Sequence, residues 1–254
     1  MKRTQFLLLT LALFATPIAF AETAPADEVK AAVKKLAEAE NYSWATTTTV
    51  PEGTRFRPGA ASGKTNKDGF SWLSNTMGDR TTESIVKAGK SVTKGDAGWQ
   101  TPEERRAARE AAGGGGGGGE GRGGRGGRNF ENFKTPAQQA EDLVGKVKEL
   151  KKDGDAYVGE LNEEAVQSLI SMGRGGRRGG GGGDDAGVPP APTDAKGTVK
   201  FWLKDGALAK METKVSGKLS FNGNDIALDR TTTTEIKDVG TTALDIPEDA
   251  KKKL

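Results

Sequence analysis

Residues 197–247 read GTVKFWLKDGALAKMETKVSGKLSFNGNDIALDRTTTTEIKDVGTTALDIP, and this stretch decides the fold. Three segments in it alternate apolar and polar residues, as strands with one buried face do. These segments are Thr198–Leu203, Ala207–Leu219 and Ile226–Ile236. The sequence therefore predicts three long antiparallel strands in a half-buried sheet.

The turn between the second and third segments sets their register. Asn222 and Gly223 suit a two-residue hairpin turn because both residue types accept positive φ. The predicted cross-strand pairs are Leu219 with Ile226, Met211 with Thr234, and Lys210 with Glu235. Apolar residues then share one face, and the lysine and glutamate form a favourable pair on the other.

The turn between the first and second segments leaves a choice of register. A two-residue loop at Asp205 and Gly206 places Phe201 opposite Lys210, because a slip of one residue inverts every side chain. A three-residue loop over 204–206 keeps the apolar residues together, so we expect this loop. It pairs Phe201 with Ala209 and Val199 with Met211, and it leaves Trp202 beside Leu208 on the outer face.

The N-terminus has the pattern of a secretory signal peptide. Lys2 and Arg3 precede an apolar run from Phe6 to Phe20, which ends in an A-x-A site at Ala21. The run is short for a membrane anchor. We expect cleavage near Ala21, no transmembrane segment afterwards, and a periplasmic or extracellular mature protein of residues 22–254.

Charge and composition exclude several functions. The chain has 38 basic and 35 acidic residues, and no His or Cys. Without Lys2 and Arg3 the surplus of basic residues falls from three to one, so no global field favours nucleic acid. The absence of His and Cys removes the common nucleophilic triads and metal ligands. We expect a non-enzymatic protein without a cofactor.

The residues before the long strands alternate between helical and strand patterns. Thr101 and Thr135 each begin a capping box followed by Pro, which is typical of a helix start. The predicted elements are a helix at Ala24–Glu40, a strand from Tyr42 to Val50, short strands within Lys64–Asn75, at Arg80–Ala88 and at Ser91–Thr93, a helix at Thr101–Ala112, a helix from Thr135 to Asp153, a strand at Ala156–Leu161 and a helix from Asn162 to Met172. This order predicts a single α+β domain with a curved, half-barrel-like antiparallel sheet and helices over one face.

Two Gly/Arg-rich tracts interrupt this domain, at about 113–128 and 173–193. Such segments cannot bury apolar surface, so we expect two disordered loops. Their candidate polyanion-contacting residues are Arg122, Arg125, Arg128, Arg174, Arg177 and Arg178. Two interpretations stay open: contact with an anionic envelope surface, or a tolerated flexible insertion.

The C-terminal part carries a family resemblance. Its pieces are Phe201-Trp202-Leu203-Lys204-Asp205-Gly206, Lys210-Met211-Glu212, Ile236-Lys237-Asp238-Val239-Gly240 and Ile246-Pro247-Glu248-Asp249-Ala250. They resemble uncharacterised secreted bacterial proteins of planctomycete type. More remotely, the chain is similar to the LolA/LppX-like superfamily of periplasmic lipoprotein and lipid carriers. The resemblance implies a half-barrel sheet that holds a lipid against helices.

These observations predict binding of a hydrophobic or lipid-like ligand, or of a lipoprotein, in the concave face of the sheet. The candidate ligand-binding residues are Val199, Phe201, Met211, Val215, Leu228 and Arg230. Arg230 shares a face with apolar residues, so its guanidinium needs a ligand head group, a carboxylate such as Glu141, or a place at the rim. The alternative function is an envelope interaction protein whose helices fill the sheet and whose Gly/Arg loops contact polyanions.

Overall fold

The computed structural model of this chain describes residues 24–52, 54, 58–111, 130–172, 192–221 and 224–254. The predicted signal peptide, all six arginines of the Gly/Arg tracts and the Asn222-Gly223 turn lie outside the described residues.

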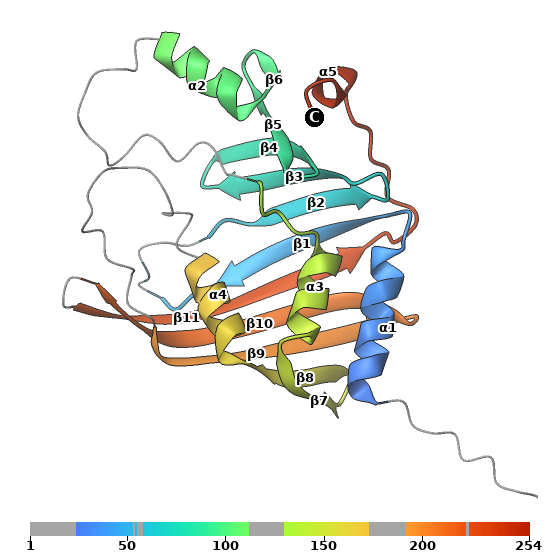
Figure 1. The fold of residues 1–254 in the computed structure, drawn as a ribbon, viewed down its shortest axis with the longest axis vertical. Coiled ribbons are helices and arrows are strands. Elements are labelled where there is room, and N and C mark those ends of the chain that lie inside the picture. The colour runs from blue at the N-terminus through green and yellow to red at the C-terminus, as the bar shows by residue number, and fades with distance from the viewer. Residues whose placement is uncertain (1–23, 53, 55–57, 112–129, 173–191, 222–223) are drawn as a thin grey trace, which may run out of the picture.

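Eleven strands form one open antiparallel sheet in the order β6-β5-β4-β3-β2-β1-β11-β10-β9-β8-β7 (Figure 1). The strands are β1 (Asn41–Thr49), β2 (Ala61–Asn66), β3 (Phe70–Met77), β4 (Arg80–Lys87), β5 (Lys90–Gly95), β6 (Gly98–Gln100), β7 (Val147–Asp153), β8 (Ala156–Leu161), β9 (Thr193–Lys204), β10 (Ala207–Phe221) and β11 (Asn224–Lys237). The helices are α1 (Pro25–Ala37), α2 (Pro102–Ala111), α3 (Pro136–Val144), α4 (Glu163–Met172) and α5 (Glu248–Lys251). The predicted α+β class, with a large antiparallel sheet and helices on a face, is confirmed.

The long strands β9, β10 and β11 lie together near the middle of the sheet, and β11 joins them to the N-terminal meander through β1. The register predicted between β10 and β11 is confirmed. The observed pairs include Leu219 with Ile226, Met211 with Thr234, and Lys210 with Glu235. The register of this hairpin therefore follows from the alternation of apolar residues.

The predicted loop between β9 and β10 is wrong. The strands are joined by two residues, Asp205 and Gly206, with φ of 52° and 71°, which suits the tight turn of a hairpin. A register shift between Leu208 and Lys210 then adds one residue to β10, as a β-bulge does. The bulge restores the apolar face, so the observed pairs are Leu203 with Leu208, Phe201 with Met211, and Val199 with Thr213. Leu208 is therefore buried in the core and not on the outer face beside Trp202.

The predicted helix from Thr135 to Asp153 is also too long. The structure ends α3 at Val144, with Gly145 as its C-cap, and residues 147–153 form β7. β7 pairs with β8 as a hairpin, and Gly154 has a φ of 61° in the turn. Leu150 is buried in the observed strand, and it would also suit the buried face of the predicted helix. Its apolar character could therefore not distinguish a strand from a helix.

The main core lies between the helices and one face of the sheet, called here the helix face. α1 contacts β10, β9 and β7, and α4 contacts β9 and β10, while α3 lies beside α1 in front of the sheet (Figure 1). Val29, Val33 and Leu36 of α1 and Val166 and Ile170 of α4 are buried in this core. Apolar residues at helical spacing thus meet the apolar face of the long strands.

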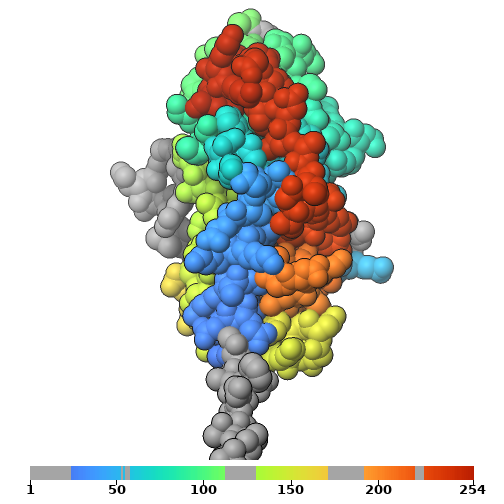
Figure 2. All heavy atoms as spheres, turned by 90° about the vertical axis from the view of Figure 1, so that its right-hand side faces the viewer, coloured from blue at the N-terminus to red at the C-terminus, as the bar shows by residue number. Residues whose placement is uncertain are grey.

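A second, smaller core lies on the opposite face of β3–β6. It is made by Ile85, Val92, Trp99, Ile246 and Ala250. Because Ile85 and Val86 are neighbours in β4, their side chains point to opposite faces. The C-terminal segment covers the Ile85 side, where Lys64 Nζ donates a hydrogen bond to the Ala243 carbonyl at 3.1 Å. Figure 2 shows this segment and α3 on opposite sides of the molecule.

The register of β10 predicts different effects of a charge at neighbouring positions. Met211 is 4% exposed on the helix face, whereas Lys210 Nζ lies 4.2 Å from the Trp202 ring centroid on the other face. Met211→Asp should lower the free energy of unfolding by about 4 kcal/mol, because a buried carboxylate has no partner there. Lys210→Asp should cost ~1 kcal/mol. Urea unfolding measures both, and equal losses would contradict the register.

Candidate functional site

A pocket of about 570 Å³ opens on the helix face. It lies where the helical cover ends, between the C-terminal end of α1, the start of α3 and the turns β2–β3 and β4–β5. Its lining residues are Ala37, Ala39, Tyr42, Thr65, Asn66, Lys67, Asp68, Gly69, Ser71, Val86, Lys87, Ala88, Gly89, Phe133, Thr135, Ala137, Gln138 and Glu141. A smaller pocket of about 360 Å³ shares Phe133, Gln138 and Glu141 with it.

Tyr42 connects the pocket with the main core. Its side chain is 3% exposed, its ring centroid lies 5.8 Å from that of Trp44, and its hydroxyl accepts a hydrogen bond from the Ala137 N–H at 3.4 Å. Burial raises the pKa of the Tyr42 hydroxyl, which keeps it neutral. Tyr42 therefore holds the start of α3 against the sheet as a neutral wall of the pocket.

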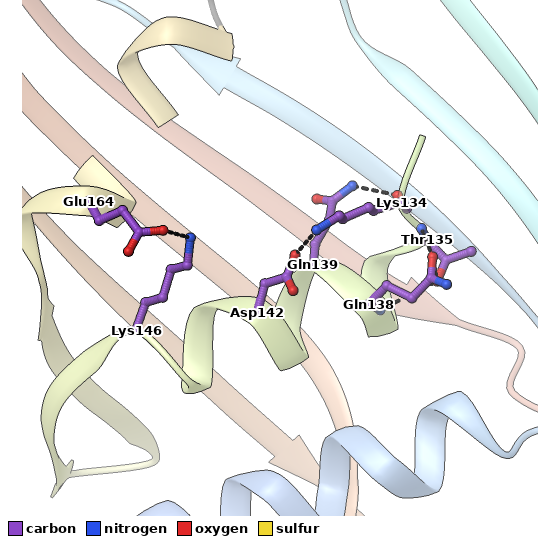
Figure 3. Close-up of polar contacts among 7 residues, drawn as sticks. All are labelled: Lys134, Thr135, Gln138, Gln139, Asp142, Lys146 and Glu164. Atoms are coloured by element: carbon purple, nitrogen blue, oxygen red, sulfur yellow. Dashed lines mark hydrogen bonds and ion pairs between the residues drawn. The ribbon is translucent and has the colours of Figure 1, made fainter. Parts of the chain in front are cut away.

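The start of α3 is fixed by its own sequence. The Gln138 side chain accepts from the Thr135 N–H at 2.9 Å, and the Thr135 hydroxyl accepts from the Gln138 N–H at 3.4 Å, as Figure 3 shows from one side. Pro136 follows at the first helical position, where its missing N–H costs nothing. Since residues three apart share a helix face, this cap directs both Gln138 and Glu141 towards the pocket.

The sheet supplies a floor of hydroxyl groups to one part of the pocket. The Thr65 and Ser71 hydroxyls are buried and lie 3.0 Å apart. Further along the same face, the buried hydroxyls of Ser84 and Thr93 are also 3.0 Å apart. The helix face is thus mainly apolar on β9 and β10, and it carries buried hydroxyl pairs on β2, β3, β4 and β5. The pocket lies at the border between these two parts.

Apolar side chains complete the pocket wall. Val86 is 3% exposed and lies on the same face as Tyr42. Phe133 packs against the main core, and its ring centroid lies 6.4 Å from that of Phe130 in an edge-on arrangement. The pocket can therefore bury an apolar group and hydrogen-bond a polar one.

The predicted ligand-binding residues all lie on the helix face; four of them are buried in the main core, and Leu228 and Arg230 are partly exposed. Val199 and Phe201 are 0%, Val215 2% and Met211 4% exposed. Val144 and Ile170 belong to the same core, and Leu169 and Val147 pack against it. None of the six predicted residues lines either pocket described above. The space beneath Phe201 and Met211 is therefore filled by the protein's own helices.

Arg230 has an internal partner. Its guanidinium donates a hydrogen bond to the Leu169 carbonyl in the last turns of α4. Carbonyls at a helix C-terminus lack intrahelical donors and attract cations. Burial lowers the pKa of Arg230. The structure thus shows an internal partner, the Leu169 carbonyl, and the partly exposed Arg230 also reaches solvent, while its contact with a ligand stays a prediction.

Sequence reasoning missed the pocket residues Tyr42, Thr65, Ser71, Phe133 and Glu141. The capping box at Thr135 and the Tyr42–Trp44 alternation were visible in the sequence. The sequence did not show that Tyr42 and Thr135 lie close together, because their proximity depends on β1 pairing with both β2 and β11.

Two further properties concern the described residues alone. Within these ranges, no group of three or more His, Cys, Asp or Glu residues could hold a metal ion. None of the helices in the described part of the chain is long and apolar enough to cross a membrane.

The chain is similar to several solved structures, among them LppX, LprF and a LolA superfamily protein. LppX, a lipoprotein of Mycobacterium tuberculosis, shares 12% identity over 87% of this chain and 97% of its own, with a TM-score of 0.43. LprF from Mycobacterium bovis shares 12% identity over 89% of this chain and 97% of its own, also with a TM-score of 0.43. A LolA superfamily protein from Nitrosomonas europaea shares 9% identity over 90% of this chain and 97% of its own, with a TM-score of 0.32.

These three proteins include LppX and a LolA superfamily protein, which the sequence resemblance named, but at 12% identity or less and with TM-scores of 0.43 or less the likeness carries no further conclusion about this chain. The expected planctomycete affinity stays a prediction. No protein-family model matches the sequence. No curated protein matches it either.

The Arg230 contact predicts a loss of stability without any ligand. Arg230→Leu should lower the free energy of unfolding of the ligand-free protein by about 2 kcal/mol, because a charged donor to a helix terminus is lost. Lys237→Leu, on the other face of β11, is the control and should cost under ~0.5 kcal/mol. If Arg230→Leu left the ligand-free protein unchanged, the guanidinium would not be an internal cap of α4.

Proposed function

We propose that this protein is an exported, non-enzymatic binder of an amphipathic, lipid-like ligand. The apolar part of the ligand lies on the helix face, in the pocket between α3 and the turns β2–β3 and β4–β5. The observation that carries this proposal is the position of the pocket at the border of the apolar and hydroxyl-rich parts of that face.

The dimensions and lining of the pocket support this function. A volume of about 570 Å³ lies within the range of ~300–1,000 Å³ that is usual for small-molecule sites. Tyr42, Val86 and Phe133 offer apolar contact, and Thr65, Ser71 and Gln138 offer hydrogen bonds. An amphipathic ligand uses both kinds of contact, whereas a purely apolar one would leave the hydroxyl groups without added partners.

The apolar residues predicted from the sequence lie outside this pocket, and they would contact only a ligand with a longer apolar chain. Tyr42 belongs both to the pocket and to the core that contains Phe201 and Met211. A ligand with a longer apolar chain would extend from the pocket towards these two residues, and α3 would have to move aside. Arg230 would then act by holding α4 in place and not by touching the ligand.

The place of action follows from the predicted signal peptide. Cleavage near Ala21 would release the protein into the periplasm or the medium. The arginines of the Gly/Arg tracts would contact anionic envelope surfaces there, and this contact would bring the pocket close to a source of lipid.

A neutral environment-sensitive dye, Nile red, tests the proposal. The purified, delipidated protein should bind the dye, and phospholipid should displace it. Phe133→Ser should weaken binding about tenfold, because losing roughly 50 Å² of apolar contact costs ~1.3 kcal/mol at ~25 cal/mol per Å². Trp202→Ser is the control, because Trp202 lies on the other face and should leave dye binding unchanged.

Two outcomes of this experiment would contradict the proposal. A larger loss with a folded Phe201→Ser variant than with Phe133→Ser would move the site beneath the helices. No dye binding at all, with association to anionic vesicles that requires Arg122, Arg125 and Arg128, would overturn the binding function and favour the envelope interaction protein.

A further inference from the structure

Most of the positive charges around the pocket are already engaged. Lys67 Nζ donates to Glu40 Oε1 at 2.6 Å. Lys134 forms an ion pair with Asp142 (Figure 3). These two lysines are each neutralised by a carboxylate, so neither offers an unpaired positive charge to a ligand.

Lys87 lies at the pocket, but its ammonium group is held elsewhere. Its Nζ lies 3.9 Å from the centroid of the Phe70 ring, and Phe70 packs against the second core on the opposite face. Phe70 and Lys87 are a cross-strand pair, as are Ser71 and Val86 next to them. Because successive side chains alternate between faces, Ser71 and Val86 point to the pocket while the Lys87 ammonium is drawn away from it.

The Glu141 carboxylate, unlike these lysines, is not engaged by another described residue. It is exposed, and it lines both pockets. Among the described residues, no hydrogen bond or ion pair engages its carboxylate, in contrast to Asp142 beside it. Phe133 lines both pockets as well, and the face of an aromatic ring attracts cations. An unengaged carboxylate and an aromatic ring therefore border the same opening.

We infer that the pocket selects amphipathic ligands with a cationic, ammonium-type head group, which Glu141 and Phe133 bind at the opening. This inference rests on the function proposed above, since the apolar part of the ligand occupies the pocket. A carboxylate attracts an ammonium group by charge, and the Phe133 ring adds a cation–π contact. An anionic head group of the same size meets the Glu141 charge. Of the described lysines at the two pockets, Lys67 and Lys134 are paired with carboxylates and Lys87 lies over the Phe70 ring.

Three amphiphiles with the same dodecyl chain test the inference by competition with Nile red, below their micelle concentrations and at low salt. They are dodecyltrimethylammonium, dodecanoate and the neutral dodecyl maltoside. The wild-type protein should prefer the ammonium compound to dodecanoate by about fivefold, the size of one exposed ion pair with a cation–π contact. The preference should shrink as salt is added, because exposed charges are screened.

Substitutions locate the source of the preference. Glu141→Gln should abolish the preference for the ammonium compound over dodecanoate, and Glu141→Lys should reverse it. Glu110→Gln on α2 is the matched control, because it removes an exposed carboxylate that lines neither pocket, and it should keep the preference.

The outcomes separate this inference from the proposed function. Binding of dodecyl maltoside with equal affinities for the two charged compounds, or a preference that survives Glu141→Gln, would overturn the head-group selection alone. If no dodecyl compound displaced the dye, the proposed function itself would fail.

Discussion

The structure depends on one constraint, which is that a sheet of eleven strands presents two wide faces and the chain must cover the apolar parts of both. The long strands β9, β10 and β11 are apolar on the helix face, and α1, α3 and α4 bury that face. At the other end of the sheet the apolar residues lie on the opposite face, and the C-terminal segment buries them through Ile246 and Ala250. Removing apolar surface from water stabilises the fold by about 25 cal/mol per Å², so covering both faces is favourable.

The pocket is a consequence of this change of faces. Where the helices end, the helix face changes from apolar residues such as Met211 to hydroxyl groups such as Thr65 and Ser71. Hydroxyl groups that form hydrogen bonds with each other do not need to be buried under apolar side chains. The helices can therefore leave an opening at this part of the sheet. The cap at Thr135 fixes one side of the opening, and the turns β2–β3 and β4–β5 fix the other. A site with both apolar and polar lining thus arises beside the main core.

The sequence predicted the strands, the register between β10 and β11 and most helix starts, because alternation, capping boxes and turn residues are local signals. It failed at the bulge after Leu208 and at the end of α3. A bulge shifts the register by one residue without a distinctive residue type, and Leu150 fits a buried position in a helix or in a strand. The predicted site residues were correctly placed on one face, but the depth of burial of Phe201 depends on how α1 and α4 pack. The pocket could not be predicted, because Tyr42, Ser71 and Glu141 meet only in the complete topology.

Hydrogen–deuterium exchange of the protein with and without saturating dodecyltrimethylammonium shows where the ligand binds, because it reports which segments a ligand orders or opens. We expect slower exchange in the turns at residues 66–70 and 86–90 and at the start of α3, with β9 and α4 unchanged. Faster exchange in α4, together with changes in β9 around Phe201, would contradict this expectation, because the ligand would then enter the space that the helices fill.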